Sequence, residues 1–420
     1  MKIVIVNLRY FISGGPERYL FNIKEVLESN GHEVIPFSVK HNLNEKSDFS
    51  SYFLDQIGTG DEVYFDKYRK TNLNDIAKLF GRMFYSFEAK TKLSKLIKAS
   101  KPDLVYVLCY QNKISPSIID AAKKFNLPVV IRISDFSLIC AANILYLSKN
   151  QEICEKCLIN GKHNLIINKC FHNSYIYSSL KFFAYQLHDI LNIYNKVDAL
   201  VAPSFFTKTK FIQAGIPEGK LSHIPTFFNF DQKERAIDYK KFALYFGRIE
   251  PEKGIKTMVD AFIDTEYQLK IIGFSATNYE NHLVDYLKDK KHNISFLGKL
   301  DFIDIIPFLQ QCSFTIVPSE CYDNFPNVIL ESFAFKKAVI ATNIGSLKEL
   351  VVNEETGLLF EYKNSGDLKN KVKVLFNDIH KTKYLGENAF NKLNTEFSKE
   401  KHYEHLIQIF TSLVKANMQK

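Results

Sequence analysis

Two pairs of charged side chains in this sequence have the types and spacing needed to bind a phosphorylated, hydroxyl-rich ligand. Arg248 and Lys253 lie close together in the stretch YFGRIEPEKG, and Asp323 and Glu331 lie in the stretch PSECYDNFPNVILES. Two cations that leave the end of one strand could neutralise a diphosphate, because guanidinium and ammonium groups donate charge-assisted hydrogen bonds to phosphate oxygens. Two carboxylates that face one cleft could accept hydrogen bonds from neighbouring sugar hydroxyls.

A third element, near the amino terminus, could approach the same ligand with bare backbone. Gly14 and Gly15 are followed by Pro16, a residue that is favoured in the first turn of a helix. Backbone without side chains lets a phosphate come close to the unpaired amides of a helix start. The dinucleotide fingerprint G-x-G-x-x-G is absent, which argues against a nicotinamide oxidoreductase.

Each of these elements also has a plain structural explanation. A basic pair at the surface is usually solvated, an acid near a helix start can simply favour the helix dipole, and a Gly-Gly pair often forms only a turn. The functional interpretation therefore requires that all three elements meet at one place in the fold.

Short apolar, β-branched stretches alternate with segments of helical periodicity along the whole chain. The expected strands form two series, at 3–6, 34–37, 104–108, 129–133 and 199–201, and at 243–246, 269–272, 294–297, 314–317, 339–341 and 358–360. This alternation predicts the α/β class, with parallel sheets that helices cover on both faces. The polar stretch DQKERAIDYKK at 231–241 lacks apolar periodicity and predicts a linker.

The sequence therefore predicts two doubly wound domains, at 1–230 and 242–400, followed by a helix at 401–420 that packs back on one of them. The ligand of such a pair belongs at the carboxyl ends of the strands, in the cleft between the domains. A helix should begin near Asn327, where its unpaired amides attract anions or hydroxyl oxygens, and Pro326 should stiffen the preceding loop.

The composition is that of an ordinary globular protein, with 46% hydrophobic and 24% charged residues. No apolar stretch approaches the roughly 18 residues that a membrane-spanning helix needs. The first residues lack the apolar core of a secretory signal. We therefore expect a cytoplasmic protein.

The formal net charge is +9, and part of the basic excess lies at 71–101, where apolar residues recur at helical spacing. A helix packed on the core with a solvated basic face accounts for this pattern. The alternative is contact with an anionic membrane surface, which would make the protein peripheral at the inner face of the membrane, or with a phosphorylated acceptor. No finger or aromatic-basic module predicts a nucleic-acid partner.

Taken together and in this order, the stretches resemble the motifs of the family 4 retaining glycosyltransferases, which have the GT-B fold. The resemblance extends over nearly the whole chain. It rests on the Gly-Gly loop, the run from Gly247-Arg248 to Gly254, the two acids, the run from Gly345 to Glu349-Leu350, and the segment at 356–360. It implies two Rossmann-like domains that face a cleft, and transfer of a sugar from a nucleotide-diphosphate donor to a glycan or lipid-linked acceptor in cell-surface polysaccharide or glycoconjugate synthesis.

The resemblance also implies a role for each matching residue. Arg248 and Lys253 would hold the donor diphosphate, and Glu331 would bind the nucleotide ribose. Asp323 would bind a hydroxyl of the transferred sugar. Gly14 and Gly15 would bring the first domain to the phosphates. The sugar pocket would be lined by the intervening segment, Asn324, Phe325, Pro326, Asn327 and Val328. No metal is implied for catalysis, since the two cations and the helix termini would stabilise the leaving diphosphate.

Three positions depart from the family pattern. Asp323 stands where Glu is commoner, with Glu320 nearby as an alternative, and Ser346 stands where a second Gly is usual. Ser134-Asp135 stands where many members have His-Asp close to the acceptor, and Ser134 cannot act as a cation or a general base. Asp135 either takes over part of that catalytic work or is an ordinary turn acid.

Four of the seven cysteines fall in an insertion at about 138–172, namely Cys140, Cys154, Cys157 and Cys170. A Cys-x-x-Cys core with two further thiols suits a tetrahedral, structural zinc site. Four incidental thiols are the alternative, and disulfides are disfavoured in a reducing compartment.

The resemblance thus implies a retaining hexosyltransferase. Two other functions compete with it: a sugar-nucleotide epimerase of the same fold, which would need no acceptor, and a non-enzymatic, zinc-stapled basic binding module, in which Asp323 and Glu331 would have no catalytic role.

Overall fold

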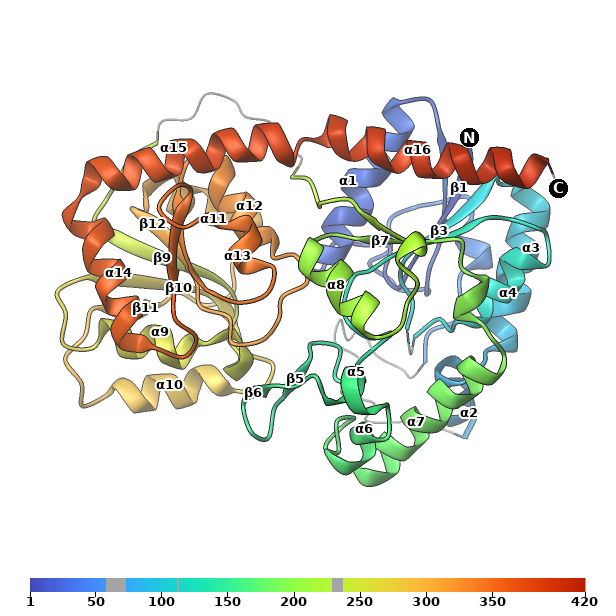
Figure 1. Ribbon diagram of the computed structural model, residues 1–420, viewed down its shortest axis with the longest axis horizontal. Coiled ribbons are helices and arrows are strands. Elements are labelled where there is room, and N and C mark those ends of the chain that lie inside the picture. Colours follow the sequence, from blue (N-terminus) through green and yellow to red (C-terminus); the bar gives the residue numbers. More distant parts are fainter. Residues whose placement is uncertain (58–72, 112, 229–236, 420) are drawn as a thin grey trace.

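The computed structural model describes residues 1–57, 73–111, 113–228 and 237–419, and it has two α/β domains side by side (Figure 1). Half of the predicted linker, residues 231–236, lies outside the described residues. Every strand expected from the sequence is present.

The N-terminal domain is built on a parallel sheet of six strands in the order β2-β1-β3-β4-β7-β8. Its strands are β1 (Lys2–Asn7), β2 (Glu33–Phe37), β3 (Leu104–Cys109), β4 (Val129–Arg132), β7 (Ala199–Ala202) and β8 (Leu221–His223). Its helices are α1 (Gly15–Ser29), α2 (Leu73–Met83), α3 (Phe87–Ser100), α4 (Ser117–Lys123), α5 (Lys156–Asn160), α6 (Asn164–Ile167), α7 (Tyr175–Ile190) and α8 (Phe205–Gln213). The central strands are almost wholly buried, as expected for a parallel sheet with both faces covered.

The C-terminal domain repeats this architecture, with the strand order β11-β10-β9-β12-β13-β14. Its strands are β9 (Phe242–Arg248), β10 (Gln268–Phe274), β11 (Ile294–Phe296), β12 (Phe314–Val317), β13 (Ala338–Thr342) and β14 (Gly357–Phe360). Its helices are α9 (Ile255–Phe262), α10 (Tyr279–Leu287), α11 (Phe302–Gln311), α12 (Asn327–Ala334), α13 (Leu347–Leu350), α14 (Ser365–Asn377) and α15 (Ile379–Glu396). The strand order reverses between β9 and β12, and a crevice opens at such a switch point.

The last helix, α16 (Lys399–Met418), returns to the N-terminal domain (Figure 1). Leu406, Phe410 and Val414 recur along one face, and they pack into the apolar cluster that β1, β3 and α1 form. The helix α16 therefore completes the apolar core of the N-terminal domain.

The segment 71–101 is not one helix. Within its described part, α2 ends at Met83 and α3 begins at Phe87, because the hydroxyl of Ser86 accepts a hydrogen bond from the backbone N–H of Ala89 and so caps a new helix. Leu93 and Leu96 of α3 are buried, in agreement with a helix that packs on the core.

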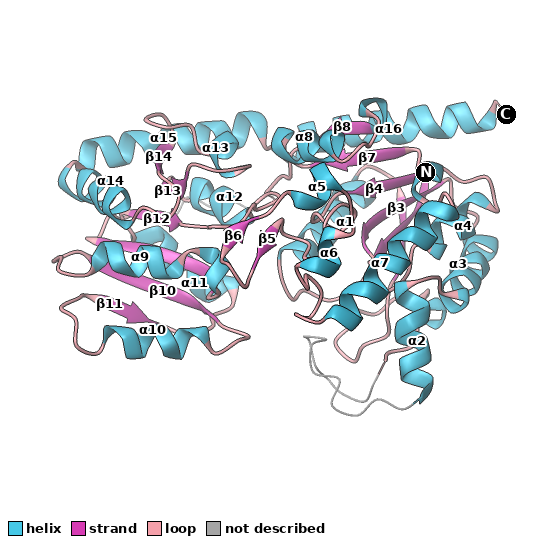
Figure 2. Cartoon of the chain, turned by 60° about the horizontal axis from the view of Figure 1, so that its bottom comes forward, coloured by secondary structure: helices cyan, strands magenta, loops and turns pink. Residues whose placement is uncertain are grey.

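The cysteine-bearing insertion carries a small hairpin, β5 (Tyr146–Leu147) and β6 (Glu152–Ile153), which extends toward the C-terminal domain (Figure 2). The Nζ of Lys363 in that domain donates to the carbonyl oxygen of Gln151 at the hairpin tip. The insertion thus bridges the two domains.

Candidate functional site in the cleft between the domains

The loops that follow β9 and β12 meet at the switch point of the C-terminal sheet. Arg248 ends β9, and Lys253 ends the 3₁₀ turn Pro251–Lys253. Gly254 then adopts a φ of 67°, and a Cβ at this position would lie 1.9 Å from the carbonyl oxygen of Pro318, just beyond β12. Only glycine allows the two loops to approach this closely. This contact places Lys253 beside Asp323.

Lys253 and Asp323 form an ion pair through Oδ1 of the carboxylate. Burial works against the charge of Lys253, but Asp323 and Cys321 more than offset it, so the pKa of Lys253 is raised. The other carboxylate oxygen, Oδ2 of Asp323, is buried and accepts no hydrogen bond from the described residues. A buried acceptor without a donor is costly, and a hydroxyl group of a ligand would satisfy it.

Glu331 lies in the second turn of α12 and pairs with Arg18 of the N-terminal helix α1. Its side chain is only 2% exposed. Burial raises the pKa of the Glu331 carboxyl, whereas the charge and hydrogen bond of Arg18 lower it. The guanidinium of Arg18 also lies 5.1 Å from the ring centre of Phe302, so this one side chain contacts two elements of the opposite domain.

Arg248 keeps a side chain that is 51% exposed, and it pairs loosely with Glu252 at 3.3 Å. The Tyr245 hydroxyl donates to the carbonyl oxygen of Arg248 and fixes its backbone. The guanidinium can therefore reorient toward a ligand without breaking a buried contact.

The helix α12 begins at Asn327, as predicted, and no side chain caps its first turn. Asn324, just before it, braces the two domains instead of remaining free for a ligand. Its Nδ2 donates to the carbonyl oxygen of Ile133 at 2.7 Å, and its Oδ1 accepts from the hydroxyl of Thr207 at 2.7 Å. A Cβ on Gly15 would lie 3.0 Å from Nδ2 of Asn327, so bare backbone does meet the start of α12 here.

The structure brings most of the predicted site into one cleft of about 410 Å³. The predicted residues that line it are Gly15, Arg248, Lys253, Asp323, Asn324, Phe325, Pro326, Asn327, Val328 and Glu331. Gly14 is adjacent, as the residue before α1, but does not line the cleft.

Asp135 does not line this cleft. Its Oδ1 accepts hydrogen bonds from the backbone N–H and the hydroxyl of Ser137, an ordinary turn arrangement, and it faces a separate cavity of about 50 Å³. Burial raises the pKa of Asp135, while those hydrogen bonds and Lys181 lower it. Ser134 lines both cavities.

Glu320, the alternative to Asp323, is turned away from the cleft, and its carboxylate accepts from the hydroxyl of Thr257 at 2.6 Å. Ser346, noted above only as a departure, donates its hydroxyl to the carbonyl oxygen of Asp323 at 2.6 Å. Ser346 therefore helps to hold the loop that carries the acid.

Sequence reasoning missed three residues of the N-terminal wall: Arg18, Tyr19 and Arg132. Arg18 stands about one helical turn after Gly15, so a signal for it was present in the run GGPER. Arg132 is the last residue of a buried strand, and a cation at that position was a second signal.

The four cysteines of the insertion are all free thiols. Burial raises the pKa of the Cys157 thiol to about 12, with smaller contributions from the nearby Cys140, Cys170 and Cys154. Among the described residues, however, no group of three His, Cys, Asp or Glu side chains is arranged to hold a metal ion. The structural zinc site therefore stays a prediction from the sequence.

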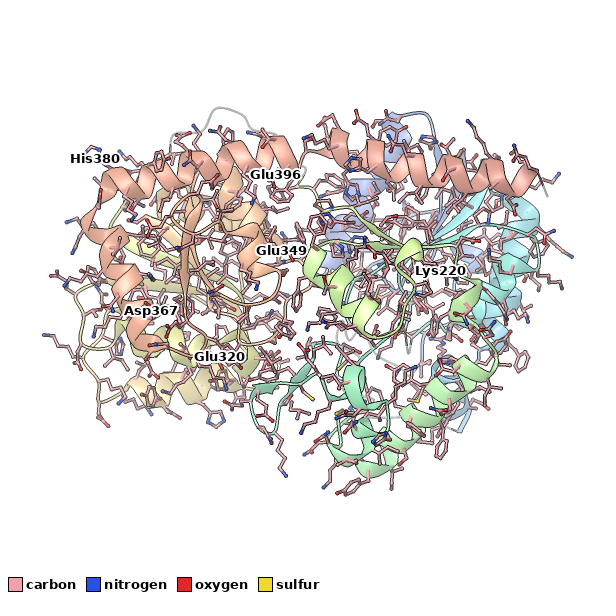
Figure 3. The ribbon with its side chains drawn as sticks, in the orientation of Figure 1. Lys220, Glu320, Glu349, Asp367, His380 and Glu396 are labelled. Atoms are coloured by element: carbon pink, nitrogen blue, oxygen red, sulfur yellow. The ribbon has the colours of Figure 1, made fainter. Side chains whose placement is uncertain are left out.

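A second cavity, of about 420 Å³, lies within the N-terminal domain between α7, the end of α8 and the insertion. Lys220, at its rim, is labelled in Figure 3. None of the four charged residues predicted to bind the donor lines it, so the inter-domain cleft is the candidate site.

In the part of the chain that the structure describes, no helix is long and apolar enough to span a membrane.

Comparison with known proteins agrees with this geometry. Residues 227–392 match the family model of the glycosyl transferases group 1. The chain is 34% identical over 204 residues to the uncharacterized glycosyltransferase MJ1178 of Methanocaldococcus jannaschii, which covers 47% of this chain and 55% of the relative. It is 27% identical over 177 residues to the capsular polysaccharide biosynthesis glycosyltransferase CapM of Staphylococcus aureus, with 41% and 46% covered. The chain thus spans about half the length of these two relatives.

The fold has solved counterparts over its whole length. The crystal structure of Anabaena Alr3699/HepE in complex with UDP matches with a TM-score of 0.67 and 17% identity, covering 98% of this chain and all of that one. The two parallel-sheet domains around a cleft thus have the GT-B fold, and residues 227–392 carry the match to the glycosyl transferases group 1.

Proposed function

We propose that the chain transfers a sugar from a nucleotide-diphosphate donor to a hydroxyl group of an acceptor, with retention of the anomeric configuration. The observation that carries the proposal is the unpaired, buried Oδ2 of Asp323 beside the Lys253 ammonium, in a cleft that Glu331 and Arg248 also line. An acceptor oxygen for a sugar hydroxyl and two cations for a diphosphate thus lie together.

In this reaction the bond between the anomeric carbon and the phosphate oxygen breaks, and its electron pair leaves with the diphosphate. The acceptor oxygen attacks from the same face and forms the new glycosidic bond, and its proton passes to the leaving phosphate oxygen. Arg248 and Lys253 would stabilise the charge that develops on the leaving group, which is the largest contribution such residues make. Glu331 would accept hydrogen bonds from the ribose, and Asp323 from the transferred sugar.

We further propose that the acceptor is a glycan or a lipid-linked glycan of a cell-surface polysaccharide, in keeping with the likeness to CapM. Large apolar side chains are exposed on neighbouring helices α5, α6 and α7: Ile159, Ile167, Tyr175, Ile176, Phe183 and Ile190. Such a surface suits docking at a membrane that carries a lipid-linked acceptor. Sedimentation with anionic vesicles would test it, with Ile176→Ser and Phe183→Ser expected to reduce binding.

A screen of nucleotide sugars identifies the donor, because a ligand that binds only the folded state raises the melting temperature. With that donor, Asp323→Ala and Glu331→Ala should each abolish acceptor-dependent release of the nucleoside diphosphate. Glu396→Ala, at an exposed site on α15, is the matched control. Conversion of the donor into an epimeric nucleotide sugar without an acceptor would indicate an epimerase, and unchanged activity in both acid variants would refute the proposal.

A further inference from the structure

Arg132 is a buried cation in the N-terminal wall of the cleft. It ends β4, it is 7% exposed, and it lines the cleft. Its guanidinium donates to the hydroxyl of Thr226 at 2.6 Å and to that of Ser134 at 3.4 Å, and its central carbon lies 3.9 Å from the ring centre of Tyr19. Its Nε is buried and has no hydrogen-bond partner among the described residues.

Two other arginines, Arg82 and Arg18, each have an acidic partner, which Arg132 lacks. Arg82 is buried as deeply, and it pairs with Glu88 and donates to the carbonyl oxygen of Asp55. Arg18, in the same cleft, pairs with Glu331. Arg132 forms no ion pair with any carboxylate that the structure describes. A charge taken out of water is costly unless a counter-charge replaces the lost hydration.

None of the described groups packed around Arg132 carries, at neutral pH, the negative charge that would compensate its guanidinium. Tyr19 and Tyr106 hydrogen-bond through their hydroxyls, and burial raises the pKa of both. His402 of α16 hydrogen-bonds to Tyr19, and its pKa is lowered to about 3 by burial, with the charge of Arg132 adding to the effect, so it stays neutral. Among the residues that the structure describes, no negative charge therefore compensates the guanidinium of Arg132 at the cleft.

We propose that Arg132 is an anion subsite, and that it binds a phosphate or carboxylate oxygen of a substrate. The proposal rests on the function proposed above, since it takes that substrate to be the sugar donor or the acceptor. Both sources offer the same chemistry: the diphosphate of the donor, or a phosphate or carboxylate on the acceptor. The subsite also supplies the positive charge that Ser134, two residues further on, cannot provide.

Two probes distinguish the sources in the purified full-length protein. UDP reports on the donor side, and inorganic phosphate titrated into UDP-saturated protein reports on an anion site that remains open. Arg132→Gln should weaken the binding of at least one of these two probes by roughly ten- to a hundred-fold, as expected for the loss of a charge-assisted hydrogen bond. Lys95→Gln, at an exposed lysine of α3, should bind both probes as the wild type does.

Loss of UDP affinity in Arg132→Gln assigns the subsite to the donor, and loss of phosphate binding alone assigns it to the acceptor. Arg132→Lys keeps the charge but not the planar fork, so it should bind with intermediate affinity, and it decides the question if the Gln variant does not fold. A melting temperature of Arg132→Gln that is unchanged or higher excludes a merely structural role, since the variant removes an unpaired buried charge.

UDP and phosphate binding within twofold of wild type in both variants would overturn the subsite. The two proposals fail separately. If no nucleotide sugar is turned over but anion binding follows Arg132, only the function is wrong. If transfer depends on Glu331 but neither probe depends on Arg132, only the subsite is wrong.

Discussion

The two walls of the cleft carry their charges in different ways. On the C-terminal wall each cation already has an acid beside it, as in the pairs Lys253–Asp323 and Arg248–Glu252. On the N-terminal wall Arg132 has no acidic partner in the described part of the chain, and Arg18 reaches across to Glu331 on the other wall. On the C-terminal wall the cations are already held by acids of the protein, so a ligand that binds there has to replace those acids as the partners of the cations. The N-terminal wall carries positive charges that an anionic group of a ligand, or an acid of the opposite domain, has to neutralise.

This difference follows from the topology of the sheets. The strands β9 and β12 are neighbours, so the loops that follow them deliver both cations and both acids to one crevice over short stretches of chain. On the other side, Arg18 and Tyr19 of α1 and Arg132 of β4 come from distant parts of the sequence, and His402 of α16 contributes only through its hydrogen bond to Tyr19.

The largest effect should come from Lys253, because its loss would remove a proposed ligand of the diphosphate and would also leave Asp323 unpaired. We expect Lys253→Gln to lower the turnover of the identified donor by roughly 10² to 10³-fold, as for other groups that stabilise a developing anion. Lys256→Gln, one turn further on, removes a half-exposed pair with Asp260 and a contact with the Tyr286 ring, and it should stay within about twofold. Equal losses in the two variants would show that the C-terminal wall is not where the leaving group binds.

Substitutions at two glycines test whether the C-terminal wall depends on the close approach of its two loops or only on the positive φ of a glycine. Gly254 and Gly31 both have positive φ, but a Cβ at Gly254 would strike the Pro318 carbonyl, whereas one at Gly31 would meet open space. We expect Gly31→Ala to cost about 1 kcal/mol of unfolding free energy, and Gly254→Ala to cost about 3 kcal/mol or more. Urea denaturation measures both, and equal costs would mean that the loops can separate freely.

The same contrast explains what the sequence could predict. Arg248, Lys253, Asp323 and Glu331 stand at short, recognisable spacings after predicted strands, so the doubly wound pattern and the family resemblance together placed them in one cleft. The choice between a catalytic role and a turn role for Asp135 did not follow from the sequence, and neither did the bracing role of Asn324, because both depend on which way a side chain turns within a packed loop. Arg132 could not be assigned either, since its lack of a counter-ion is a property of every element around it.

The Arg18–Glu331 pair joins the two walls and should give the binding of the donor a pH dependence. Burial raises the pKa of the Glu331 carboxyl and Arg18 holds it down, so the ribose loses its charged acceptor as the pH falls through that raised pKa. Without Arg18 the carboxyl keeps only the effect of burial. We therefore expect the affinity of Arg18→Gln for the identified nucleoside diphosphate to fall at a higher pH than that of the wild type.

Calorimetric titrations between about pH 5 and 8 measure this shift. The variant Glu331→Gln cannot titrate, so its affinity should show no such step and serves as the reference. Superimposable pH profiles for Arg18→Gln and the wild type would mean that Arg18 contacts Glu331 without influencing its ionisation.

The smallest effect should come from Glu349, which joins the domains without lining the cleft (Figure 3). Its carboxylate accepts hydrogen bonds from the backbone N–H groups of Phe205 and Phe206, at the start of α8 in the opposite domain. An acid at a helix start typically contributes about 1 kcal/mol. We therefore expect Glu349→Ala to lower the unfolding free energy by about that amount, and Glu349→Gln, which keeps one acceptor oxygen, by less.

Because the contact sets how the two walls face each other, Glu349→Ala should also lower kcat/KM for the donor by roughly fivefold, which is about 1 kcal/mol of transition-state stabilisation, while UDP still binds to the intact C-terminal wall. Glu387→Gln, at an exposed pair with Lys336, is the control for charge alone. If Glu349→Ala weakened UDP binding as strongly as Lys253→Gln does, the two walls could not be treated as independent, and the C-terminal wall would owe its arrangement to the N-terminal domain.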